Sequence, residues 1–105
     1  MRTKDAGATY RIPVKDKYGL PIAQIESLLK IRNSKGALAA LTKVPRSTGD
    51  TDRRSMIAGA AKANDNDFDG ALLLFSRIKL FEGTPTEYYL ATKTFAIAQN
   101  YQKAM

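Results

Sequence analysis

The sequence predicts an all-α fold, either an antiparallel four-helix bundle or an array of helical hairpins, with an extended N-terminal arm. Three observations support this prediction. Apolar residues recur with helical spacing in several stretches after residue 20. Asp67 and Thr84 stand where N-cap residues are expected. Short polar loops separate the apolar stretches, as they do between antiparallel helices.

The first segment, residues 1–20, is predicted to be an extended basic arm, and residues 21–105 are predicted to form the helical domain. The arm contains several Lys and Arg residues and only a brief alternation of apolar and polar residues, at positions 10–15. Pro13 interrupts this alternation and cannot donate a hydrogen bond to a neighbouring strand, which argues against a central strand. The arm is expected to lie along a partner or along its own helices.

Residues 21–44 predict one bent helix or two short ones. Pro21 is suited to the first position of a helix, and apolar residues with helical spacing follow it. The run Asn33-Ser34-Lys35-Gly36 breaks or bends this pattern, and Pro45 ends it. Residues 45–52 have the composition of a loop.

Three further helices are expected in the second half of the chain. The first spans about residues 52–63 and has many small residues on one face. The second begins after Asp67 and is predicted to end at Gly83. The third begins at Thr84-Pro85-Thr86-Glu87, which combines a capping Thr, a first-turn Pro and a Glu in a capping box.

The composition excludes several classes of chemistry. The 105 residues include no Cys, no His and no Trp. This rules out a disulfide scaffold, a zinc or haem site of ordinary ligation, and a Cys-His or Ser-His-Asp nucleophile. Glu26, Glu82 and Glu87 are isolated along the chain and are interpreted as surface or capping residues. We therefore expect a protein that is not an enzyme and binds no cofactor.

The positive charge lies in the first half of the chain. The formal net charge is +7, and residues 1–54 account for all of it. Such a gradient favours docking onto an acidic surface of a larger protein assembly. The candidate partner-binding residues are Arg2, Lys4, Arg11, Lys15, Lys17, Arg32, Lys35, Lys43, Arg46, Arg53 and Arg54. The alternative is non-specific binding to nucleic acid through Lys30 and the same Lys and Arg residues from Arg32 onward.

One stretch resembles the opening of a calcium-binding loop. Asp65, Asp67 and Asp69 occupy its first, third and fifth positions, with Gly70 at the sixth. Ser76 stands at the twelfth position, where the loop requires a Glu. Acidic residues also favour a helix N-terminus, so capping is the preferred interpretation of these three residues.

The region from residue 56 to residue 83 resembles one tetratricopeptide repeat. Gly59, Phe68, Ala71 and Phe75 have the spacing of that family's helix-turn-helix unit. The resemblance implies a peptide-binding module as a further alternative, with a groove between the helices that contain Met56 and Phe68. No second clean repeat follows in the sequence.

A second resemblance covers more of the chain. It depends on four features in order: Pro45 after a helix, a polar loop, a long helical stretch, and residues 83–89 at the start of a final helix. In this order of features the chain is similar to the small extrinsic four-helix subunits of photosystem II, the oxygen-evolving-enhancer type. This resemblance implies a non-catalytic basic subunit that docks through its N-terminal arm in the thylakoid lumen. A native Met1 would instead indicate the cytoplasm. No apolar run is long enough to cross a bilayer, so we expect no integral membrane protein, although peripheral association stays open.

Overall fold

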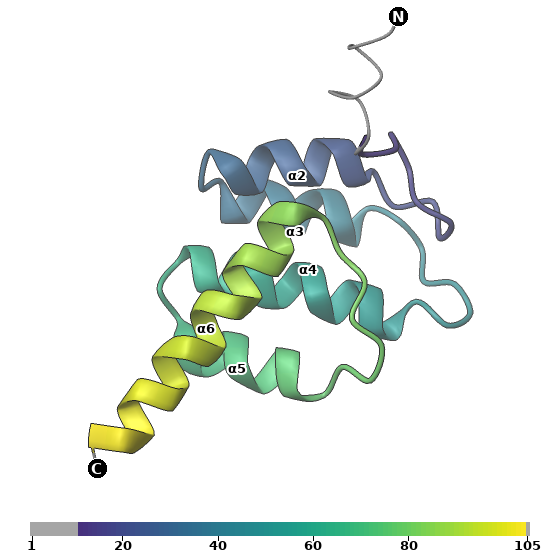
Figure 1. Ribbon diagram of the computed structural model, residues 1–105. Coiled ribbons are helices and arrows are strands. Elements are labelled where there is room, and N and C mark those ends of the chain that lie inside the picture. Colours follow the sequence, from purple (N-terminus) through teal and green to yellow (C-terminus); the bar gives the residue numbers. More distant parts are fainter. Residues whose placement is uncertain (1–10, 105) are drawn as a thin grey trace, which may run out of the picture.

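The described part of the chain contains five helices and no strands. The structure is a computed structural model that describes residues 11–104 (Figure 1). The helices are α2 (Ile22–Lys30), α3 (Ser34–Thr42), α4 (Thr51–Asn64), α5 (Phe68–Ser76) and α6 (Pro85–Ala104). This confirms the all-α prediction. None of these helices is both long and apolar enough to span a membrane.

The first hairpin forms because residues 31–33 interrupt the helical pattern. The structure has two short helices here, α2 and α3, and the side chain of Asn33 caps α3 by accepting a hydrogen bond from the backbone N of Gly36. Residues 11–20 precede α2 without regular secondary structure. They pack against the helices, since Leu20 is completely buried.

The second hairpin differs from its prediction at one boundary. Helix α4 begins and ends within one residue of the expected limits, but α5 ends at Ser76 and not at Gly83. The Asp52 carboxylate accepts hydrogen bonds from the backbone N of Lys79 and of Leu80, at 3.2 and 3.1 Å. This contact from α4 holds the chain after α5 in a non-helical path. Gly83 does not adopt the positive φ of a helix C-cap.

The two hairpins share the same turn, 34 positions apart. Arg32 and Asn66 both have positive φ, of 61° and 63°. The next residue in each hairpin caps the second helix, and the side chain of Asp67 accepts from the backbone N of Gly70 as that of Asn33 does from Gly36. The backbone N of Asn33 donates to the carbonyl of Leu28, and that of Asp67 donates to the carbonyl of Lys62, at 2.8 and 2.9 Å; in both hairpins the acceptor lies five residues earlier. The predicted capping role of Asp67 is therefore confirmed.

Burial follows the same repeat. The residue pairs Leu29 and Ala63, Ala37 and Ala71, and Leu41 and Phe75 are each separated by 34 positions, and all six residues are buried. Helix α6 also starts 34 positions after α4. The described chain therefore consists of two equivalent hairpins followed by a helix that corresponds to the first helix of such a unit.

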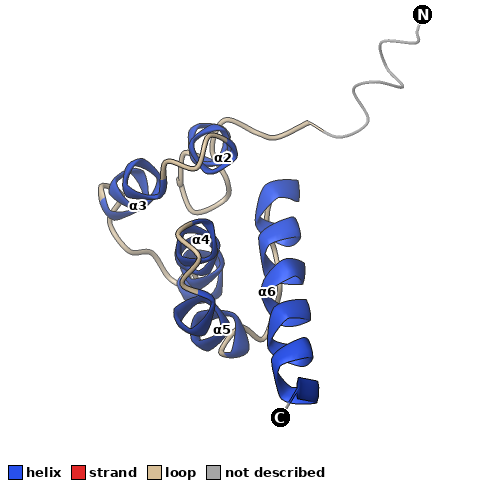
Figure 2. Ribbon diagram, turned by 90° about the vertical axis from the view of Figure 1, so that its left-hand side faces the viewer, coloured by secondary structure: helices blue, strands red, loops and turns tan. Residues whose placement is uncertain are grey.

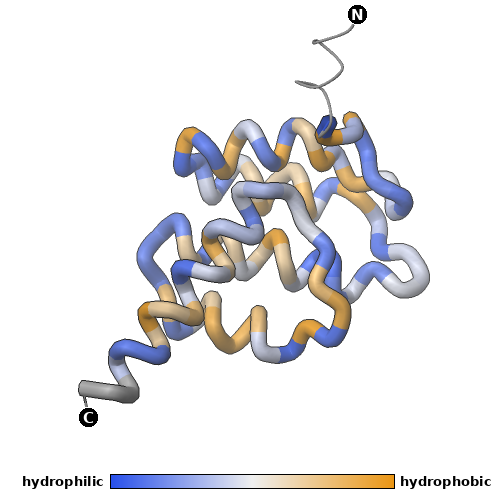
Figure 3. Tube along the Cα trace, viewed as in Figure 1, coloured by the Kyte–Doolittle hydropathy of each residue, from blue (hydrophilic) through white to orange (hydrophobic). Residues whose placement is uncertain are grey.

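Helix α4 forms the centre of the fold. It contacts the other four helices and lies between α3 and α6 (Figure 2). Met56, Ile57 and Ala60 on this helix are completely buried. Gly59 lets α5 approach closely, because a Cβ at this position would lie 2.6 Å from Cε1 of Phe75. Helix α5 is mostly hydrophobic, and the turn before it is hydrophilic (Figure 3).

Candidate docking surface

Two of the predicted partner-binding residues, Arg53 and Arg54, lie inside the protein. Their exposed fractions are 6% and 9%. The prediction that these two residues contact a partner is therefore wrong for the folded protein. Their positions explain the error: Arg53 shares a helical face with Ile57 and Ala60, which are buried in the core. An Arg-Arg pair beside a polar loop has the composition of a basic surface, and this local pattern does not show that both side chains face inward.

Arg53 joins α4 to the start of α6. Its Nη1 and Nη2 donate to the two carboxylate oxygens of Glu87, at 2.5 and 3.0 Å. Its Nε lies 3.6 Å from Oδ2 of Asp16, in the segment before α2. Glu87 has no exposed surface, so this bidentate pair compensates a charge that water cannot reach.

Glu26 extends this network to α2. It is 2% exposed, and its carboxylate accepts hydrogen bonds from the Thr84 hydroxyl and from the hydroxyl and backbone N of Thr86. The Thr84 oxygen also lies 3.0 Å from Oε2 of Glu87. We call Asp16, Glu26, Arg53, Thr84, Thr86 and Glu87 the inner clasp. It links the N-terminal segment, α2, α4 and α6.

The inner clasp places two carboxylates around one hydroxyl. Thr84 has a single hydroxyl hydrogen and so can donate to only one of its two carboxylate neighbours at a time. Burial raises the pKa of Glu87, and the nearby charge of Glu26 adds to this effect, whereas Arg53 and Thr84 oppose it. Glu26 and Glu87 were interpreted as surface or capping residues, and their burial shows that neither is a surface residue. Glu26 shares a helical face with the core residues Ile22 and Leu29, and that spacing was the available signal.

Arg54, also in the first turn of α4, joins this helix to the end of α3. Its Nε donates to Oδ2 of Asp50 at 2.6 Å. Its Nη1 and Nη2 donate to the backbone carbonyls of Leu41, Val44 and Pro45. It therefore binds carbonyl groups left free where α3 ends. The Arg54 hydrogen bond, followed by that from the Ser47 backbone, lowers the pKa of Asp50.

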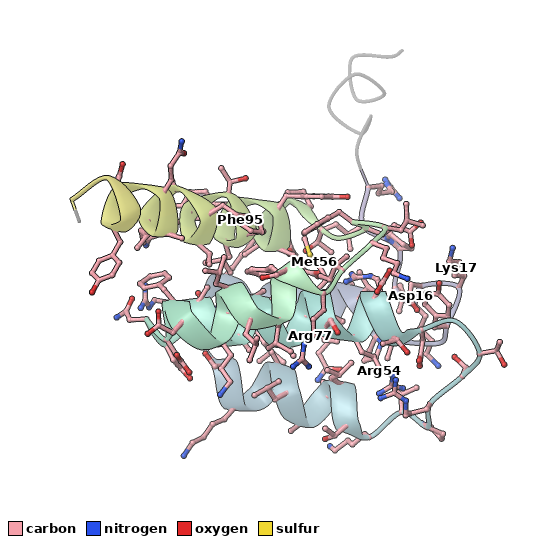
Figure 4. All side chains as sticks on the ribbon, turned by 90° about the horizontal axis from the view of Figure 1, so that it is seen from below. Asp16, Lys17, Arg54, Met56, Arg77 and Phe95 are labelled. Atoms are coloured by element: carbon pink, nitrogen blue, oxygen red, sulfur yellow. The ribbon has the colours of Figure 1, made fainter. Side chains whose placement is uncertain are left out.

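The N-terminal segment brings its cations to the same end of the molecule. Asp16, Lys17 and Arg54 lie at one end, away from Phe95 (Figure 4). A cavity of about 490 Å³ opens there between residues 13–18 and 82–88, and Lys15 and Lys17 are part of its wall. Lys17 lies 3.7 Å from Glu82, whose charge is the main reason that the pKa of Lys17 is raised. Arg11 and Lys15 are exposed.

The remaining predicted cations are exposed on the first hairpin and the loop after it. Arg32, Lys35, Lys43 and Arg46 are all exposed. Arg32 donates to the backbone carbonyl of Asn64 at 2.7 Å. Arg46 lies 3.6 Å from Asp50 and donates to the Thr51 hydroxyl. Arg2 and Lys4 fall outside the described residues.

The aspartates of the calcium-like stretch are used within the fold. Asp65 accepts a hydrogen bond from the Ser34 hydroxyl at 2.8 Å. Asp67 caps α5 and lies 3.5 Å from Lys62. Asp69 lies in the first turn of α5. Residues 11–104 contain no group of three or more carboxylates arranged to hold a metal ion.

The peptide groove was expected between α4 and α5. These helices pack directly on each other, since Phe75 fills the space beside Gly59. Comparisons of the chain with protein-family models, curated proteins and solved structures found no match. The resemblances to tetratricopeptide repeats and to photosystem II subunits stay predictions.

Proposed function

We propose that this protein is a non-catalytic accessory subunit that docks onto an acidic surface of a larger protein assembly through its first hairpin. One observation carries the proposal: Glu26 is the only acidic residue between positions 21 and 44, and it is buried in the inner clasp. The exposed charges of this hairpin are therefore all positive. They are Lys30, Arg32, Lys35 and Lys43.

The second hairpin does not show this bias. Asp65, Asp67 and Asp69 are exposed around its turn, and Lys62 pairs with one of them. Opposite charges on one surface weaken its attraction for a charged partner, whereas a surface of one sign steers association. Burial of Arg53 and Arg54 removes these two arginines from any docking role.

The exposed part of the N-terminal segment adds positive charge to the proposed docking surface. Arg11 and Lys15 are exposed close to the start of α2, and Lys17 is held by Glu82. An assembly with an acidic docking surface therefore meets positive charge from the segment and from the hairpin. The inner clasp keeps these two parts together, because Asp16 and Glu26 belong to it.

Fluorescence anisotropy with labelled poly-glutamate tests the proposal on the full chain. Two double variants with the same change in formal charge are compared. The first combines Lys35→Glu with Lys43→Glu on the first hairpin, and the control combines Arg77→Glu with Lys79→Glu after α5. Each exposed ion pair contributes about 0.2–1 kcal/mol. Reversing two of them should therefore weaken binding about tenfold.

The expected result has three parts. The first-hairpin variant loses affinity, the control variant keeps most of it, and wild-type binding weakens as salt is added. Equal losses in the two variants, or binding that does not respond to salt, would show that the first hairpin is not the docking surface. A labelled DNA duplex of matched charge is titrated in parallel, and tighter binding to it would favour the nucleic-acid alternative.

A further inference from the structure

A shallow apolar groove runs along the outer side of the first hairpin. Its volume is about 330 Å³. Its apolar lining includes Pro21, Leu28, Ala40 and Val44. Leu28 and Val44 pack against the core on one side and face the groove on the other. Ile31, three positions after Leu28 in sequence, is 72% exposed and continues this apolar line.

The repeat shows what kind of element fits this face. Positions 34 residues after Pro21, Gln24 and Ala40 are Ser55, Ala58 and Leu74 of the second hairpin. These three residues share a cavity of about 270 Å³ with Leu41 and Thr42 of α3. Helix α3 also packs on α4.

Helix α3 therefore lies beside the corresponding face of the second hairpin, where it packs on α4. Within residues 11–104, no helix covers this face of the first hairpin. Because the two hairpins share their turn and their buried positions, the groove has the shape of a helix-binding face whose helix is missing from the described chain.

The charges beside the groove define the occupant. Ala39 and Lys43 line the groove, and Lys35 lies four positions before Ala39 and therefore on the same face of α3. Lys35 and Lys43 are exposed, and no carboxylate is exposed on this hairpin. We infer that the groove binds an amphipathic helix of a partner protein, with an apolar stripe on the groove floor and carboxylates facing Lys35 and Lys43. This inference rests on the proposed function and specifies its partner.

Three labelled peptides of equal length and net charge separate the two ideas. The first peptide is a helix of about 14 residues, roughly 21 Å long, with Leu on one face and Glu elsewhere. The second has the same composition scrambled so that the Leu residues share no face. The third is poly-glutamate with neutral polar residues in place of Leu. Ala39→Trp fills the groove without a change in charge, and Ala96→Trp on the exposed side of α6 is its matched control.

The expected result is tighter binding of the amphipathic peptide than of the scrambled one, by about tenfold or more. Ala39→Trp should remove this preference and leave poly-glutamate binding unchanged, whereas Ala96→Trp should change neither. Equal affinities for all three peptides, all reduced by Lys35→Glu with Lys43→Glu, would overturn the groove inference and leave the proposed function intact. Failure of all three to bind at low salt would overturn both. Circular dichroism checks that both Trp variants keep the helical fold.

Discussion

Replacing Arg53 with methionine removes the cation that pairs with Glu87 in the inner clasp. Methionine keeps much of the length of the side chain, so the change is mainly one of charge. The arginine donates two hydrogen bonds to Glu87, which has no exposed surface. Glu26 lies on the other side of Thr84, so without Arg53 its carboxylate would lie near the uncompensated charge of Glu87.

The expected cost follows from this burial. Removing one partner of a buried ion pair costs about 3–5 kcal/mol, because the other charge stays out of water without compensation. A chain of this size has a free energy of unfolding of roughly 5–15 kcal/mol. We therefore expect Arg53→Met to lose a large share of the stability, with a fall in Tm of at least about 12 °C.

Urea unfolding followed by far-UV circular dichroism measures this loss. Arg77→Met is the matched control, since Arg77 is exposed, and it should change the free energy of unfolding by less than about 0.5 kcal/mol. The double variant Arg53→Met with Glu87→Gln removes the uncompensated charge and should recover part of the loss. A loss below about 1 kcal/mol in the single variant, or a double variant no more stable than the single one, would refute the reasoning.

Three further predictions concern the pH response, the close helix contact and the helix caps. Because burial raises the pKa of Glu87 above its unfolded value, the folded state binds more protons between the two pKa values, and its stability should fall as the pH rises through that window. Urea unfolding at a series of pH values should show this fall in the wild type and not in Glu87→Gln; a wild-type slope no steeper than the variant's would contradict it. Gly59→Ala should destabilise by about 1–2 kcal/mol, because overpacking against Phe75 exceeds the gain in helix propensity, and thermal unfolding that shows a gain in Tm would disprove this. Asp67→Ala should cost about 1 kcal/mol through loss of the cap, and Asp69→Ala less; equal losses in urea unfolding would argue against the capping role.

The helices were predictable where a local signal marks their ends. Thr84 and Pro85 mark the start of α6, and Asp67 marks the start of α5, because capping depends on residues within one turn. The end of α5 was not predictable in this way. It depends on Asp52, which binds the backbone of Lys79 and Leu80 from another helix.

The inner clasp was hidden by the chemistry of its residues. Charged side chains are mostly found on protein surfaces, so Arg53 was expected to face a partner and Glu87 was expected to be a surface or capping residue. Their burial depends on an ion pair between residues 34 positions apart in the sequence. No local sequence pattern indicates such a pair. The repeat was hidden as well, because its equivalent positions hold different residues, such as Leu41 and Phe75.

The exposed cations of the docking surface were the more predictable part of the site. Lys35 and Lys43 were expected to bind a partner, and the structure places both on the exterior of one hairpin. The inward orientation of Glu26 was not predicted, although its spacing from Ile22 and Leu29 places it on the buried face of α2. Its burial leaves this hairpin with positive charge alone.

The most direct test of the docking surface is a titration of the isotope-labelled full chain with poly-glutamate, followed by the backbone amide signals in NMR spectra. Our account predicts that the largest shifts occur in α2, α3 and the turn between them, and that they are lost in the Lys35→Glu with Lys43→Glu variant. Shifts centred on α5 and α6, or spread evenly over the protein, would contradict it.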